Sequence, residues 1–309
     1  MRLKALYHGT AFARVLTAVQ RVAKVGYLIL SPERVLVTAF AGAASGPTLD
    51  GTSQGHQGLG SAARLRSSDD DVTVWAEMHA GVLFAELLIA SRDDNRIGLK
   101  VDLSLLAKAL HGADRAEQVI VRLSKKGAQP YLTFELHMEG QQTVVAEHHV
   151  PVCLCSPQEV NAYTQPVKGD GALRVAIPGV RPLAKIVDRM KTVGRVLAID
   201  AVMESHNTAT LRLRLETHLV YIQSQLTGLR VFDGVPADHD NVDGRPVVAL
   251  HADVRKITRM LPAHLSSAGH SVQLWLRAGH SVALSVQIGS GCELVYACPA
   301  SVNDGFVQA

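Results

Sequence analysis

Apolar and charged positions alternate at helical spacing over residues 180–193, within the stretch from Leu173 to Gly194. A strand-like run precedes this helix, and Pro178 and Pro182 suit its first turn, where the missing amide would have no partner. One face is predicted to be buried because it carries apolar residues at a period of 3.6, namely Ala184, Ile186, Val187 and Met190. Another face carries cations at every fourth position, at Arg181, Lys185 and Arg189. The pattern predicts a helix that packs its apolar side against the protein core and can bind an anion with its basic side.

Similar patterns predict the elements of the first half. A strand over 2–8 leads to a helix capped by Thr10, and a turn at Ser31-Pro32-Glu33 predicts a hairpin. That helix is predicted to be buried through Phe12, Val15, Leu16, Val19, Val22 and Ala23. Further strands are predicted over 72–78, 84–89 and 97–101, then a helix over 102–112 capped by Asp102, then strands over 118–123, 131–138 and 143–150.

The order strand, long helix, strands, short helix, three strands then begins again. The second half is predicted to hold a strand over 173–177, the opening helix, strands over 196–203, 210–216, 218–225 and 247–251, a helix over 253–264, and strands over 272–277, 282–288 and 293–298. A repeat of this length is a duplicated domain rather than a solenoid unit. Each half is rich in strands and has two helices, so we expect an α+β fold with antiparallel sheets.

Two stretches interrupt the order. Residues 42–71 are dominated by glycine, serine and alanine, and predict a disordered surface insertion. Residues 156–171 contain two prolines, two glycines and little apolar order, and predict a linker. We therefore expect a first domain over 1–155 and a second over 172–309.

Composition narrows the class of protein. Hydrophobic residues make up 47% and charged residues 19%, which is globular. No apolar run reaches membrane-spanning length and the N-terminus has no apolar signal segment, so we expect a soluble intracellular protein without a membrane partner. The spacing of Cys153, Cys155, Cys292 and Cys298 fits neither a zinc ribbon nor a redox pair, and predicts reduced structural thiols.

The net charge is only +3, but the positive charge is gathered on the predicted helices. Most carboxylates lie in loops or at strand ends, such as 69–71, 93–94 and 233–243. Helices that share a basic surface suit a phosphate backbone and would contact it independently of sequence. The helical cations are Arg14, Arg21, Lys24, Lys108, Arg181, Lys185, Arg189, Lys191, Arg255, Lys256 and Arg259.

Catalytic motifs are not found. The chain has 14 histidines without a metal-binding frame, and the neighbours His148 and His149 must face opposite sides of a strand. No phosphate-binding GK[ST] motif or nucleophile elbow occurs. We expect neither an enzyme, a metal site nor a cofactor. An enzyme of unknown chemistry and a pure protein-interaction scaffold remain as alternative classes.

Four stretches, in this order and spacing, resemble a known family. They are LILSPERV (28–35), VTVWAEMHAGVLFAELLI (72–89), LAKALHGADRAEQVIVRLSKK (106–126), and IPGVRPLAKIVDRMKTVG followed by LRLRLETHLVYIQSQL (177–226). HADVRKITRML (251–261) reinforces them. The chain resembles the sliding-clamp fold of PCNA and, within it, the Hus-type subunit of the Rad–Hus–Rad checkpoint clamp. The resemblance covers nearly the whole chain apart from 42–71 and 233–246.

The resemblance implies a non-enzymatic nuclear protein, one of three different two-domain subunits in a ring around duplex DNA. The other two subunits would be Rad-type, a clamp loader would place the ring, and the ring would recruit checkpoint signalling and DNA repair factors. The helical cations named above would then face the DNA. At Ala184 and Lys185 this chain shifts a cation by one position relative to the family pattern. The alternative within the same fold is a homotrimeric replication clamp of the PCNA type.

Ring assembly is expected to use sheet edges, because an unpaired edge is a template for another strand. By analogy with clamps, the edges are 143–150 and 218–225. The expected interface residues are Thr143, Val145, Glu147, His149, His218, Val220, Ile222 and Ser224.

Overall fold

The structure is a computed structural model that describes residues 1–8, 11–41, 71–113, 115–138, 144–163, 172–233, 246–262 and 271–301. The described residues form two compact units. The first comprises those within 1–68, 73–165 and 288–294, and the second those within 69–72, 166–287 and 295–309. The expected cap Thr10, the insertion from 42 to 70, Thr143 and most of the 233–246 loop lie outside the described residues.

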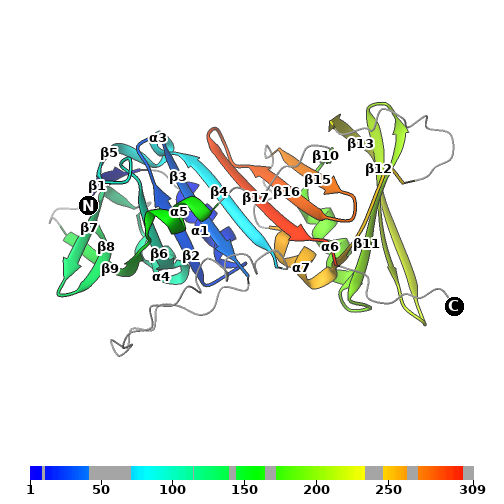
Figure 1. Cartoon of the computed structure of the whole chain (residues 1–309), viewed down its shortest axis with the longest axis horizontal. Coiled ribbons are helices and arrows are strands. Elements are labelled where there is room, and N and C mark those ends of the chain that lie inside the picture. The colour runs from blue at the N-terminus through cyan, green and yellow to red at the C-terminus, as the bar shows by residue number, and fades with distance from the viewer. Residues whose placement is uncertain are drawn as a thin grey trace. The chain divides into compact units, whose positions relative to one another are not determined.

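The first unit contains nine strands and four helices among its described residues (Figure 1). In chain order they are β1 (Arg2–Tyr7), α1 (Ala11–Gln20), β2 (Val25–Leu30), β3 (Arg34–Phe40), β4 (Thr73–His79), α3 (Ala80–Leu83), β5 (Phe84–Ala90), β6 (Ile97–Asp102), α4 (Leu103–Ala109), β7 (Ala116–Lys126), β8 (Gln129–Met138), β9 (Val144–Leu154) and α5 (Pro157–Ala162).

All strand pairs of the first unit with a defined register are antiparallel, and they form two sheets. One has the order β5-β1-β7-β8-β9, and the other has the order β4-β3-β2-β6-β9. Strand β9 belongs to both, because Val144–Pro151 pair with β8 whereas Val152–Leu154 pair with β6.

The second unit repeats this order of elements. It consists of β10 (Leu173–Ile177), α6 (Val180–Met190), β11 (Val196–Ser205), β12 (Thr208–Glu216), β13 (Tyr221–Asp233), β14 (Val248–Asp253), α7 (Val254–Met260), β15 (Val272–Arg277), β16 (Ser281–Gln287) and β17 (Cys292–Pro299). One sheet has the order β13-β12-β11-β14 and the other includes β13-β10-β15-β16. Strand β13 runs through both sheets and corresponds to β4 and β5 of the first unit, which α3 separates.

The core of each unit lies where the helices meet the two sheets. In the second unit a small apolar gap is lined by both helices and both sheets, through Leu183, Val187, Ile199, Leu211, Leu213, Ile257, Met260, Leu261, Leu274 and Val282. Its volume is about 10 Å³, which holds at most one water molecule. The apolar face of each helix is therefore used to seat the helix on the sheets.

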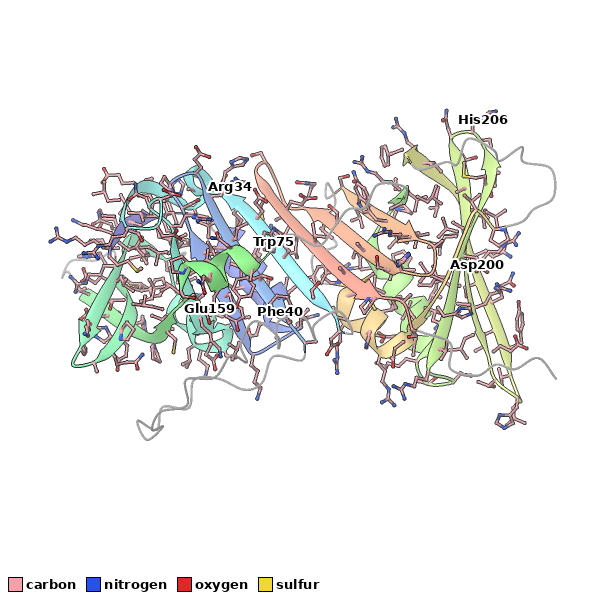
Figure 2. All side chains as sticks on the ribbon, viewed as in Figure 1. Arg34, Phe40, Trp75, Glu159, Asp200 and His206 are labelled. Atoms are coloured by element: carbon pink, nitrogen blue, oxygen red, sulfur yellow. The ribbon has the colours of Figure 1, made fainter. Side chains whose placement is uncertain are left out.

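Two short helices were not expected from the sequence. Helix α3 interrupts a strand, and α5 lies within 156–171, where the sequence suggested little order. A capping box starts α5: the Ser156 side chain accepts from the Glu159 amide, and the Glu159 carboxylate accepts from the Ser156 amide. Beyond α5, the Tyr163 ring lies 4.4 Å from the Tyr27 ring and 6.0 Å from that of Phe40 (Figure 2 labels Phe40 and Glu159). This contact explains why the segment is ordered.

Two helices end earlier along the chain than the sequence predicts. Helix α1 ends at Gln20, because the amides of Val22 and Ala23 both bond to the Val19 carbonyl and close a tight turn. Helix α7 ends at Met260, since Leu261 precedes Pro262 and is extended. Strand β13 starts at Tyr221 rather than 218, because a turn occupies the residues before it.

Candidate nucleic-acid interface

Helix α6 presents the two faces that its sequence predicts. Val180, Leu183, Val187 and Met190 are buried at spacings of three and four residues. Ala184 and Ile186, which were expected in the core, are half-buried at the margin of this face. Arg181, Lys185 and Arg189 are all exposed and lie one turn apart along the opposite face. The helix therefore holds three cations in a row above a side fixed to the core.

The residues after α6 are less uniformly basic. Lys191 caps the helix, and its Nζ lies 3.2 Å from the Asp188 carboxylate. Both side chains are exposed, so the pair is weak, but it offsets the Lys191 charge locally. Lys191 thus differs from the row formed by Arg181, Lys185 and Arg189.

Asp253 is the N-cap of helix α7, and the sequence predicts the helix to start at this residue. The Asp253 carboxylate accepts from the Arg255 amide at 2.8 Å, and the Arg195 Nε lies 3.0 Å from its second oxygen. Burial raises the pKa of Asp253, but the hydrogen bonds from Arg195 and from the amides of Arg255 and Lys256 outweigh it, so the pKa is lowered overall. The Asp253 carboxylate is therefore already bonded at the helix start and does little to offset the charges of Arg255 and Arg259. Both of these side chains are exposed, whereas Lys256 is half-buried.

Arg195 was missed by the sequence analysis. It stands in the turn between α6 and β11, where no helical or strand period applies, and its side chain is 82% exposed. It adds a cation beside the start of α7.

The cations of the first unit are arranged differently from the prediction. Arg14 lies on α1 and Lys108 on α4, and both are exposed. Arg21 and Lys24, which were expected on the polar face of α1, instead lie in the turn after it, because the helix ends at Gln20. The Lys24 carbonyl accepts from the Leu103 amide at 2.8 Å, which places Lys24 at the start of α4.

The two main helices of each unit lie side by side. In the first unit Gln20 Nε2 donates to Ser104 Oγ at 3.1 Å, joining the end of α1 to α4. In the second unit α6 and α7 share the apolar gap described above. The sequences of these four helices contain eight arginines and lysines but only one carboxylate, Asp188. Such a helix pair is suited to contacts with phosphate groups.

Two strand segments have a side that pairs with no described strand. Val144–Pro151 of β9 pair with β8 alone, and Tyr221–Leu226 of β13 pair with β12 alone. Val145 is 49% exposed, and Glu147 is exposed while His149 is half-buried. On β13, Ile222 and Ser224 are half-buried, whereas His218 and Val220 lie in the preceding turn and are exposed.

The tip before β13 is unusually apolar for a surface. Leu219, Val220 and Tyr221 are 81%, 43% and 56% exposed. Three consecutive exposed apolar residues next to an open strand edge are typical of a protein–protein contact. Val220 is one of the interface residues predicted from the sequence, whereas Leu219 and Tyr221 were not predicted, because no period distinguishes them.

The cysteines are unlike reactive thiols. All four are free, and burial raises the pKa of Cys155, Cys292 and Cys298 to about 12 each. Within the described ranges, no three His, Cys, Asp or Glu side chains lie close enough to hold a metal ion. None of the helices in the described part of the chain is long and apolar enough to cross a membrane.

Solved structures share this fold. PCNA from A. fulgidus, solved with the C-terminal region of FEN-1, is 10% identical, with a TM-score of 0.61 over 98% of this chain and 100% of that chain. PCNA from Thermococcus kodakaraensis is 13% identical, with a TM-score of 0.62 over 97% and 100%. The predicted PCNA-like α+β fold is confirmed.

Curated relatives that match this chain in sequence are checkpoint proteins of one kind. Checkpoint protein hus1 of Schizosaccharomyces pombe is 24% identical over 70% of this chain and 76% of its own length. The Dictyostelium discoideum homologue is 25% identical over 63% and 70%, and human HUS1 is 24% identical over 62% and 68%. The family model of Hus1-like protein matches residues 62–302. The chain therefore belongs to the Hus1-like family.

Proposed function

We propose that this chain is one subunit of a heterotrimeric DNA-damage checkpoint clamp that encircles duplex DNA. The two clamp domains would be the ones expected from the sequence, over residues 1–155 and 172–309. The Hus1-like family and the PCNA-like fold support a checkpoint sliding clamp. The ring would be nuclear, would be placed on DNA by a clamp loader, and would recruit checkpoint and repair proteins.

The observation that carries the proposal is the exposed row Arg181, Lys185 and Arg189 on a helix whose other side is buried. A rigidly seated row of cations at a spacing of about 6 Å can follow a phosphate backbone without reading bases. Arg14, Lys108, Arg255 and Arg259 extend the same chemistry to the other helices. Contacts of this kind hold a ring on DNA and still let it slide.

Ring closure would use the two open edges. We propose that β9 pairs with one neighbouring Rad-type subunit and β13 with the other. The two edges differ in chemistry: Val145, Glu147 and His149 lie along β9, whereas β13 starts at the apolar tip. Unlike edges favour unlike neighbours, because each edge can then select its own partner.

A homotrimeric replication clamp is the second candidate. Both kinds of clamp share the fold, but the chain is 24% identical to checkpoint relatives and only 10–13% identical to the PCNA structures. The checkpoint function is favoured for this reason. Light scattering tests it: the purified chain should not form a closed trimer, and a stable homotrimer would favour the replication clamp.

The proposed role needs no catalysis. Burial raises the pKa of the Cys155, Cys292 and Cys298 thiols, which disfavours their reactive thiolate forms. We therefore propose that the chain binds and recruits rather than converts a substrate.

Charge reversal tests the DNA contact. A ring assembled with R181E, R189E and R255E should lose most of its DNA retention, and the slope of log affinity against log salt should fall by about 3. Arg34 is a suitable control, because it is paired to Glu77 at 3.0 Å on β3 and β4 rather than on a helix. If R34E weakens DNA retention as much as the helix variant, the helices are not the DNA-binding surface.

A further inference from the structure

The turn that follows α6 places Arg195 beside the start of α7. The amides of Val193 and Gly194 both bond to the Met190 carbonyl, at 2.9 and 3.2 Å, and close this turn. A Cβ at Gly194 would lie 2.8 Å from Leu215 Cδ2, so the turn is packed closely against β12. The backbone at Arg195 is therefore held in a fixed position.

Two contacts attach Arg195 to the residues that begin α7. Its carbonyl accepts from the Val254 amide at 2.9 Å, and its Nε donates to Asp253 Oδ2 at 3.0 Å. The other oxygen of Asp253 accepts from the Arg255 amide at 2.8 Å. The guanidinium is therefore oriented by an acceptor that is itself held in place.

The two Nη groups of Arg195 remain available for a ligand. The side chain is 82% exposed, and among the described residues the Asp253 carboxylate is its one partner. Nε uses one of the five N–H donors of a guanidinium, and the Nη edge can still give two parallel hydrogen bonds to one phosphate. An ion pair this exposed adds little stability, so its main effect is to fix the direction of the Nη edge.

The carboxylates on the neighbouring elements are already engaged or point elsewhere. Asp188 lies 3.2 Å from Lys191, and Asp200 pairs with Arg214. Glu204 accepts from the Thr210 hydroxyl. Glu216 alternates with Leu215, which packs under the turn, so Glu216 points to the other face of the sheet. With Asp253, these are all the carboxylates of five elements, namely α6, β11, β12, β14 and α7.

One more carboxylate approaches from outside these elements. The charges of Asp71 and Asp253 both raise the pKa of the Cys298 thiol, and that of Lys256 lowers it, so these groups lie near one another. Asp71 accepts from its neighbouring amide at 2.8 Å. Against Asp71 and Asp253 stand Arg195 and the three cations of α7, so the surface beside Arg195 stays net positive.

The first unit has a cation at the equivalent position. The first residue of β2 lies opposite Asp102, the N-cap of α4, and the first residue of β11 lies opposite Asp253, the N-cap of α7. The residue before each strand, Lys24 or Arg195, accepts from the first amide of the helix, at 2.8 and 2.9 Å. Lys24 is also exposed. The duplicated fold thus places a cation here twice, but only arginine can be held by Nε and still present a donor edge.

We propose that Arg195 binds a phosphate group of duplex DNA through its Nη groups, and that Asp253 positions it. The inference rests on the proposed DNA-encircling function and adds a contact that lies between α6 and α7 rather than on a helix. A flexible surface cation loses side-chain freedom when it binds, whereas Arg195 is restricted beforehand and loses less. Asp253 is a positioning residue, because it acts on the phosphate only through Arg195.

The charge of Asp253 and its positioning role predict opposite results. If Asp253 acted only as a negative charge, Asp253→Asn would strengthen DNA binding, as is expected for Asp188→Asn. If it positions Arg195, D253N should weaken binding. Asparagine has a single side-chain oxygen, which cannot cap α7 and also accept from Arg195 Nε in the arrangement that the two carboxylate oxygens provide.

The test measures binding of fluorescently labelled duplex DNA to the assembled ring by fluorescence anisotropy at several salt concentrations. R195A should lower the affinity about fivefold or more and reduce the slope of log affinity against log salt by about 1. R195K keeps the charge and the slope, but should still bind about twofold or more weakly than the original ring. D253N should weaken binding about twofold or more, and should cause no further loss when combined with R195A.

A comparable ion pair elsewhere on the surface is the control. Arg34 (labelled in Figure 2) lies 3.0 Å from Glu77, on β3 and β4. R34A and E77Q should leave the DNA affinity within about 1.5-fold of the original. Urea unfolding of each separate chain shows that the variants remain folded.

Three results overturn the inference: an unchanged affinity and salt slope in R195A, a D253N ring that binds DNA more tightly, or an equal loss from D253N with and without Arg195. The outcome is separate from that of the proposed function. If the original ring binds no DNA, both fail. If R181E/R189E/R255E loses DNA binding and R195A does not, only the role of Arg195 is excluded.

Discussion

Arg195 Nε and Asp253 Oδ2 lie 3.0 Å apart and connect the start of β11 to the start of α7. The Asp253 carboxylate is 12% exposed, so this charge sits in a more enclosed place than its exposed partner. The same carboxylate caps α7, which carries three of the proposed DNA-facing cations. The carboxylate that caps α7 therefore also pairs with the Arg195 guanidinium, so changing it affects both the helix start and the local charge.

Asp253→Asn should lower the free energy of unfolding by about 0.5–1 kcal/mol at pH 7, since asparagine keeps the cap but loses the ion pair. The pKa of Asp253 is lower in the folded chain than its ordinary value of 3.8. The extra stability is thus complete above pH 3.8 and is lost as the pH falls through the folded-state pKa. Urea unfolding at several pH values measures this. A difference that stays constant down to pH 3 would contradict the expectation.

Gly98→Ala should destabilise the first unit by about 1–3 kcal/mol, because the new methyl group would overpack the contact with α5. A Cβ at Gly98 would overlap Val160 Cγ2 and would lie 3.1 Å from Cys155 Cβ. Val160→Ala should restore part of the loss in the double variant. Gly81→Ala is the control, since nothing lies within 4 Å of its Cβ position. Additive losses in G98A/V160A would show that the contact is not the cause.

Asp188→Asn should strengthen DNA binding by the assembled ring about twofold at low salt, because it removes the one carboxylate in the four helices. Lys191→Ala should weaken binding less than Arg189→Ala, since Lys191 is paired to Asp188. Electrophoretic mobility shift at two salt concentrations measures both. An equal loss in K191A and R189A would show that the ion pair does not reduce the contribution of Lys191.

Tyr221→Lys should weaken ring assembly without unfolding the chain. Tyr221 is 56% exposed, so the stability of the separate chain should change by less than about 0.5 kcal/mol. Assembly with partner subunits should weaken about tenfold or more, because a lysine would be placed at an apolar contact. Size-exclusion chromatography with light scattering measures the ring. Leu88→Lys is a matched control: Leu88 is 68% exposed on β5, at the opposite end of its sheet from β9, and its substitution should leave assembly intact.

The helix faces could be predicted from sequence because burial on the core imposes a period of 3.6 residues. The period could not show that α1 ends at Gln20, since Val22 stays buried in the turn that follows and continues the apolar pattern. The placement of Arg21 and Lys24 on this helix was wrong for that reason. In α5, by contrast, Ser156 and Glu159 stand at capping-box spacing, so a local signal was present but was outweighed by the prolines and glycines around it.

The stacking of Arg174 against the Phe232 and Trp275 rings, with the guanidinium carbon 4.8 Å and 5.0 Å from the ring centres, could not be predicted from the sequence. Arg174, Phe232 and Trp275 are far apart along the chain and meet only through the registers of β13, β10 and β15. Strand alternation indicates that each points outward, but cross-strand neighbours depend on pairing, which a single sequence does not define. The open edges of β9 and β13 depend on the same pairing.

Strand β13 joins the two sheets of the second unit by bulges rather than by a break. Its thirteen residues run from Tyr221 to Asp233, with irregular register against β12 and β10 and a φ of 66° at Gly228, whereas α3 breaks the corresponding path in the first unit. One end of β13 is the open edge and the other carries Phe232. Because a bulge bends a strand and increases its twist, β13 can pass from one sheet to the other within a single hydrogen-bonded strand, where the first unit needs two strands and a helix.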